Sequence, residues 1–360
     1  MSGAISGAGF PVLGQLTASL TQIKQNFDTL TEQASSGMIS NTYAGLGGTA
    51  PIALSLGPQI DSLTIAQSNI AAASGPAQVT QTAMTQIGSI AASLAAAMPN
   101  LTGLDSGEVD SIAANARSEL AQVGDLLDSQ YGGVYVFAGQ DSSNPPVPNP
   151  DQIATSGFFT QISAAVGALS TSGAAATTAA TLTIATSNAA GTSPFSLYLS
   201  QSTTAISPPS VATGNGQSQT IGLLASGNTS VVSTGTSTTG SYMRDLMRAL
   251  ATVGSLSSSQ VNDPNFGSLI ADTQTSVNGA VTAMSTDVGT LGEQQSNLTA
   301  LSTTLNDTAT ALTGQLSTAQ DVDMASTLSN LSLVQTQLQE SYQLIAAEGG
   351  MSLAKFLPVS

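Results

Sequence analysis

The apolar residues near the beginning of the chain fall on one face of a long predicted helix. They follow one another at alternating three- and four-residue steps, with Thr, Gln, Asn and Asp between them. This spacing is that of the a/d seam of a coiled coil. The helix is expected to end at Ser35-Ser36-Gly37, because glycine readily adopts the backbone conformation that closes a helix. The seam positions are Leu13, Leu16, Leu20, Ile23, Phe27 and Leu30.

The C-terminal part of the chain carries two seven-residue series of apolar positions. The offset between them predicts a shift of register near residues 321–323. Gly349-Gly350 predicts the end of the last helix, and a short apolar segment follows it. The first series is Leu291, Leu298, Leu305, Leu312 and Ala319, and the second is Met324, Leu331, Leu338 and Ile345. The candidate assembly seam of this end consists of Leu331, Leu338, Ile345, Leu353, Phe356 and Leu357.

The middle of the chain divides into helical segments and a segment of different composition. Helical spacing covers residues 52–94 up to Pro99-Asn100, residues 106–130 and a short amphipathic stretch at residues 244–256. Residues 144–239 are dominated by Pro, Gly, Ser and Thr, with short alternating runs at 181–184 and 196–199 that predict strands. The Ala/Thr/Ser tract at residues 170–186 predicts no particular structure.

These elements predict a mainly α fold with a β-rich insertion. Long antiparallel helices from both termini form a coiled coil or helical bundle, because each carries a seam that must be buried, and a small β domain projects outward. The expected domains are a terminal coiled coil of residues 1–40 and 318–360, a helical bundle of residues 41–143 and 240–317 with a hairpin near 134–139, and a β-rich or flexible outer insertion at residues 144–239.

Composition narrows the possible functions. The 360 residues carry a formal net charge of −16, with five basic residues and neither His, Cys nor Trp. No Ser-His-Asp triad, Cys nucleophile, disulfide or thiolate–imidazole zinc site can be built from them. The few basic residues argue against nucleic acid and an anionic membrane surface as partners. No cleaved signal and no membrane span is predicted, and polar but uncharged outer helix faces favour packing against further copies of the chain.

Several groups of polar residues resemble calcium-, phosphate- or anion-binding sites, but each departs from the pattern that such a site needs or has a structural interpretation. Acidic residues at 105–110 and at 321–323 lack the loop pattern of a calcium site. Gly235–Ser241 has the glycine spacing of a phosphate-binding loop but Ser in place of its lysine. Arg244, Asp245 and Arg248 could bind an anion, although pairing of the arginines with acids on neighbouring helices is favoured. We therefore expect no enzymatic activity, no catalytic residue, no metal and no cofactor.

Both ends of the chain resemble the flagellin family of bacterial axial proteins. Residues 20–37 resemble the family's first helix with its Ser-Ser-Gly end, and residues 321–357 resemble its terminal helix. Residues 132–139, Gly-Gly-Val-Tyr-Val-Phe-Ala-Gly, followed by Pro145-Pro146, are similar to a turn found in the members of the family that join hook to filament. The acidic pair that usually follows Ser-Ser-Gly is replaced here by Tyr43-Ala-Gly-Leu-Gly.

The resemblance implies a structural axial component of the bacterial flagellum that joins hook to filament by helical self-assembly. The alternative is a filament flagellin, and a third possibility is an enzyme or adhesin carried on the insertion. The implied partners are other copies of the chain, neighbouring hook-associated protein and flagellin, and an export chaperone. The implied location is extracellular, after export by the flagellar type III apparatus without a cleaved signal peptide.

Overall fold

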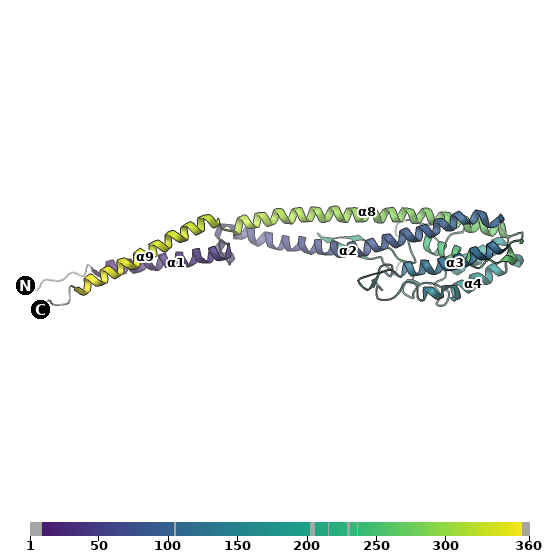
Figure 1. Cartoon of the computed structure of the whole chain (residues 1–360), viewed down its shortest axis with the longest axis horizontal. Helices are drawn as coiled ribbons and strands as arrows, with labels where there is room; N and C mark the ends of the chain where they lie inside the picture. Colours follow the sequence, from purple (N-terminus) through teal and green to yellow (C-terminus); the bar gives the residue numbers. More distant parts are fainter. Residues whose placement is uncertain are drawn as a thin grey trace, which may run out of the picture. The chain divides into compact units, whose positions relative to one another are not determined.

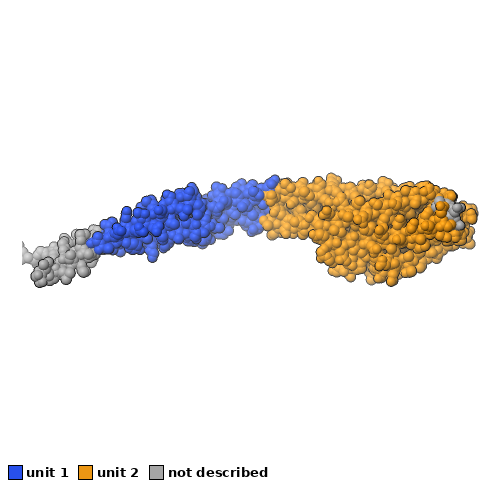
Figure 2. Space-filling view, viewed as in Figure 1, with its two compact units in different colours: residues 1–63, 307–360 blue, residues 64–306 orange. Residues whose placement is uncertain are grey.

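The computed structural model describes residues 9–103, 106–201, 206–214, 216–228, 231–235 and 237–354. The chain divides into two compact units, shown in Figure 2. Unit 1 comprises residues 1–63 and 307–360, and unit 2 comprises residues 64–306. Two long helices, α2 (Ala50–Ala97) and α8 (Phe266–Gln320), contribute residues to both units. In the part of the chain that the structure describes, no helix is long and apolar enough to cross a membrane.

Unit 1 is built around the helices from the two ends of the chain. Helices α1 (Gly9–Ser36) and α9 (Met324–Ala354) lie side by side (Figure 1), with the 3-10 helix η1 (Tyr43–Thr49) after α1. The end of α1 lies beside the start of α9, because the Val322 N–H donates to the Gly37 carbonyl at 3.0 Å. The two helices therefore run in opposite directions, as the terminal seams predict.

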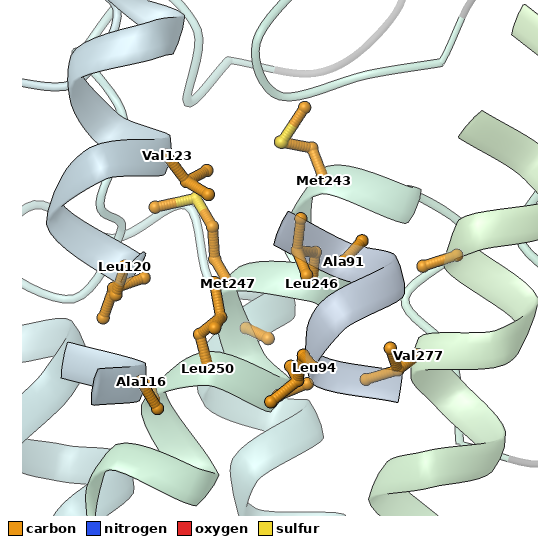
Figure 3. Packing of buried hydrophobic residues seen from close by; sticks show 14 of the residues in the cluster. Ala91, Leu94, Ala116, Leu120, Val123, Met243, Leu246, Met247, Leu250 and Val277 are labelled. Atoms are coloured by element: carbon orange, nitrogen blue, oxygen red, sulfur yellow. The ribbon is translucent and has the colours of Figure 1, made fainter. Parts of the chain in front are cut away.

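Unit 2 contains the main hydrophobic core. Helix α7 (Tyr242–Gly254) lies at its centre, packed against α3 (Ser106–Leu127), α4 (Gly157–Gly167) and α6 (Ala174–Thr186). Figure 3 shows Met247 and Leu250 of α7 close to Leu120 of α3, and all three side chains are fully buried. Burial of these side chains stabilises unit 2. The remaining short helices are η2 (Met98–Gly103), η3 (Pro150–Thr155), α5 (Leu169–Ser172) and η4 (Ser258–Gln260).

Two small antiparallel hairpins complete unit 2. Strands β1 (Gln130–Tyr131) and β2 (Val134–Tyr135) are joined through Gly132 and Gly133, both with positive φ. Strands β3 (Ser210–Gly214) and β4 (Gln217–Thr220) form the second pair, with a register shift between Ala212 and Gly214. The first hairpin thus lies slightly earlier than the predicted 134–139. Residues 136–138 instead enter the interior, where Phe137 is fully buried.

The predicted fold class, long helices with a small β region, is confirmed. The predicted end of the first helix is also confirmed, since Gly37 has φ +73° and its N–H donates to the Gln33 carbonyl at 2.9 Å. The predicted register shift coincides with a break between α8 and α9. The predicted end at Gly349-Gly350 is wrong, because α9 continues to Ala354.

The strands predicted at residues 181–184 and 196–199 are wrong. The first run lies inside α6, and the second lies in a non-strand turn segment. Alanine has the highest helix propensity, and in α6 the Thr183 hydroxyl donates to the Ala179 carbonyl at 2.9 Å. Burial of Thr177 and Thr181 against the core then holds the tract helical. Phe158 and Ile162 of α4 belong to the same buried cluster as α3 and α7.

Candidate functional site

The best candidate for a functional surface is the terminal helix pair of unit 1. On α1 the predicted seam residues are partly buried while most of the residues between them are exposed, and the same holds on α9. Helices α1 and α9 contact each other, and the partly buried positions on each include the predicted seam residues, as expected for a coiled coil. The described members are Leu16, Leu20, Ile23, Phe27 and Leu30 on α1, and Leu331, Leu338 and Ile345 on α9. The side chains of Leu13 and Leu353, and residues Phe356 and Leu357, lie outside the part that the structure describes.

Backbone hydrogen bonds hold the ends of α1 and α9 in register. Met38 and Asp321 form an antiparallel β-bridge, and the Ile39 N–H donates to the Gln320 carbonyl at 2.7 Å. The Asp323 carboxylate accepts from the Ala325 N–H at 3.0 Å, which caps the start of α9. The acidic residues at 321–323 are therefore explained by the break between the helices rather than by a metal ion.

A second apolar surface on α9 was not predicted from the sequence. Five large apolar side chains outside the seam are exposed by between 40% and 60%. They are Met324, Leu328, Leu333, Tyr342 and Leu344. Helical spacing places Leu333 and Leu344 on the side of α9 away from the seam, and we call these two the outer apolar face of α9. The sequence did contain an indication of this surface, because Leu328, Leu333 and Leu344 belong to neither seven-residue series. Exposed apolar groups of this number on one helix are typical of a protein that packs against other molecules.

The charged residues of α7 form a structural network inside unit 2. Asp245 is fully buried and accepts from the Thr238 hydroxyl and from the Thr239 N–H at 2.8 Å. Arg248 is also buried and donates to the Ser276 hydroxyl at 2.6 Å. Burial lowers the pKa of Arg248, and the carboxylates of Asp245 and Asp272 oppose that shift. This network ties α7 to α8 through the Ser276 hydroxyl. Pairing of Arg248 with acids stays a prediction, since its hydrogen bonds in the described part of the chain go to Thr181, Ser237 and Ser276.

The same prediction is wrong for Arg244. Its guanidinium donates to the Ala185 carbonyl and to Asn188 Oδ1, at 2.9 and 2.8 Å. It also lies 5.2 Å from the centre of the Phe195 ring. The pKa of Arg244 is lowered by burial, and no carboxylate contributes to that shift. The residues of α7 are amphipathic in their arrangement, as predicted, but the helix is buried on nearly all sides.

The other polar groups singled out in the sequence make structural contacts. Asp110 accepts from the Ser258 N–H at 2.8 Å, and Ser241 of the phosphate-loop-like segment caps α7. Among the residues described, no group of three or more His, Cys, Asp or Glu side chains could hold a metal ion. The Tyr242 hydroxyl donates to Asp287 at 3.0 Å, and burial raises the pKa of this tyrosine. These contacts tie helix ends and loops together.

Comparison with known proteins agrees with this arrangement. The model of the bacterial flagellin N-terminal helical region matches residues 14–142, and that of the C-terminal helical region matches residues 275–357. None of the curated proteins matches the chain. A solved structure from Vibrio parahaemolyticus, assigned as a flagellar hook-associated protein, is similar with a TM-score of 0.51 at 10% identity. The likeness covers 77% of this chain and 98% of that one, and at this identity it concerns the fold.

The two matched regions include most of α1, all of α9 and the first hairpin, and together they cover more than half of the chain. These matched elements are the terminal helix pair of unit 1 and the hairpin of unit 2. The chain therefore belongs to the flagellin family and is a structural component of the bacterial flagellum.

Proposed function

We propose that this protein joins the hook to the filament, in the manner of hook-associated protein 3. The observation that carries the proposal is the segment Tyr-Val-Phe-Ala-Gly at residues 135–139, similar to the turn of the junction proteins. In unit 2 this segment is anchored by the buried Phe137, whose carbonyl accepts from the Ala225 N–H at 3.0 Å. The flagellar hook-associated protein of Vibrio parahaemolyticus shares this fold, which is in keeping with a place among the hook-associated proteins.

Assembly is proposed to proceed through the terminal helices. Residues 1–40 and 318–360 would form the terminal coiled-coil domain, and residues 41–143 and 240–317 the helical bundle. Residues 144–239 would form the outer domain, with the inner side of this domain sharing the core of the bundle. The outer apolar face of α9 then packs against other copies of the chain and against neighbouring hook-associated protein and flagellin. Burial of these side chains supplies the driving force for assembly.

The remaining parts of the proposal concern export and chemistry. The protein reaches the cell exterior through the flagellar type III apparatus without a cleaved signal peptide, with the help of an export chaperone. It is not an enzyme, which is in keeping with a structural family and with buried polar groups that stabilise helix ends and loops. Nucleic acid is not a partner, because the chain has only five basic residues against 21 acidic ones.

The second candidate is a filament flagellin, because the terminal helices match the family as a whole. The two functions place the protein at different positions on the flagellum. An epitope inserted at the exposed Leu197 can be localised by immunogold electron microscopy on intact flagella. A single band of gold where hook meets filament is expected for the junction protein. Label along the whole filament would contradict the junction role and establish the flagellin.

A further inference from the structure

A cavity of about 610 Å³ opens on unit 2 between the end of α6 and the start of α7. This volume lies within the usual range for small-molecule sites. Its wall combines amide and hydroxyl side chains with an apolar part formed by Leu199, Val231 and Val232. The charged group in the lining is Arg244. The polar side chains of the wall are Thr186, Asn188, Gln201, Ser226, Asn228, Thr239 and Ser241.

The guanidinium of Arg244 is held in place by neutral groups. Nη1 donates to the carbonyls of Ala185 and Ser187, at 2.9 and 3.4 Å, and Nε donates to the Ser226 carbonyl at 3.4 Å. Nη2 donates to Asn188 Oδ1 at 2.8 Å. The Phe195 ring lies 5.2 Å from the guanidinium carbon and fixes its plane. The positive charge is therefore fixed at the cavity wall before any ligand arrives.

No carboxylate of the surrounding chain neutralises this charge. The sequence contains no Asp or Glu between residues 152 and 244, and this stretch includes the whole described lining of the cavity. Arg248, one turn further along α7, has Asp245 and Asp272 close enough to favour its charged form. Burying a cation without an opposite charge costs free energy, which an incoming anion would offset. The cavity thus differs from the rest of a chain whose net charge is −16.

We propose that this cavity binds a small sugar acid, with its carboxylate on Arg244. Four of the five N–H groups of Arg244 donate to the acceptors named above, so the remaining Nη2 N–H would donate one charge-assisted hydrogen bond to the carboxylate. The amides of Asn188 and Gln201 and the hydroxyl of Ser241 offer donors and acceptors to sugar hydroxyl groups, and the apolar part of the wall suits a pyranose ring face. A planar apolar acid would leave these polar groups unpaired, which lowers its affinity.

The test uses the full chain and D-glucuronate as probe, with D-glucose and sulfate as comparisons. Binding is measured by titration calorimetry at about 0.15 M salt, where charges more than roughly 8 Å apart are largely screened. We expect saturable binding of glucuronate, with both comparisons weaker by at least about tenfold. An absence of saturable binding up to about 50 mM would overturn the proposal, since that affinity is below the useful range. So would equal binding of glucose or of sulfate.

Variants assign the binding to Arg244. Arg244→Gln is expected to weaken glucuronate binding by at least about tenfold, while Lys24→Gln on α1 leaves it unchanged. Unchanged binding by folded Arg244→Gln would overturn the proposal and leave Arg244 only as a cap of the α6 carbonyls. If Arg244→Gln does not fold, Asn188→Ala decides in its place. This variant keeps the guanidinium and removes one lining amide, so wild-type affinity would refute the site.

Discussion

Replacing Leu338 tests whether the α1–α9 seam is a real but weak interface in the free protein. Leu338→Ala removes a partly buried side chain from the seam, whereas Leu333→Ala removes a side chain of the same helix that is 58% exposed. Complete burial of a leucine is worth about 1.5–3 kcal/mol. The partial burial of Leu338 therefore predicts a loss of about 1 kcal/mol, and Leu333→Ala should stay within about 0.5 kcal/mol of wild type.

A leucine in the core of unit 2 shows how large the loss of stability is when a fully buried side chain is truncated. Leu120 is fully buried, and Leu120→Ala should cost about 3 kcal/mol, because a cavity remains after truncation of a core leucine. The assay is native-state hydrogen exchange on peptides of α9 and of α3, which gives the free energy of opening for each helix. Leu338→Ala should lower it in α9 and leave α3 unchanged. Equal effects of Leu338→Ala and Leu333→Ala on α9 would refute the seam.

Three further predictions concern unit 2. A Cβ at Gly279 would lie 2.2 Å from the Thr234 carbonyl oxygen, so Gly279→Ala should lower the melting temperature. A Cβ at Gly289 of the same helix would meet open space, so Gly289→Ala should raise the melting temperature, because alanine has the higher helix propensity. Arg248→Met should cost about 3 kcal/mol in urea unfolding, because the buried Asp245 loses the favourable charge of Arg248 and the Ser276 hydroxyl loses a hydrogen-bond donor. A neutral effect would show that the network is dispensable. The pKa of Asp128 is raised to about 6, first by burial and then by the charge of Asp125, while the Val147 N–H opposes the shift. Because this folded-state pKa exceeds the ordinary 3.8, the free energy of unfolding should fall as pH rises from about 4 to about 6. Asp128→Asn should remove that part of the pH dependence, which urea titrations at several pH values would measure.

The long helices could be predicted because their pattern is local. The a/d spacing from Leu16 to Leu30 and the series from Leu331 to Ile345 each describe one helix face, and on both helices these positions are partly buried. The end of α1 was equally predictable, because Gly37 adopts a positive φ. Such features depend on neighbours in the chain and need no knowledge of the tertiary fold.

Elements that depend on tertiary contacts could not be predicted. Helix α6 is a tract of Ala and Thr without a clear apolar face, and it is held by burial of Thr177 and Thr181 against residues far along the chain. The backbone carbonyls that accept from Arg244 could not be predicted, because every residue has a carbonyl and residue type does not show which of them lies near the guanidinium. The outer apolar face of α9 was missed for a different reason: its leucines belong to no interface within the chain.

The most direct test of the account asks whether this outer apolar face is covered on the flagellum. The chain has no cysteine, so Leu333→Cys and Leu344→Cys each introduce a single thiol at a side chain exposed by 58% and 60%. The rate of maleimide labelling is then measured on the free chain and on intact flagella that carry the same variant. The account predicts rapid labelling of the free chain and strong protection in the assembled flagellum. Equal labelling rates in the two states would contradict assembly through α9.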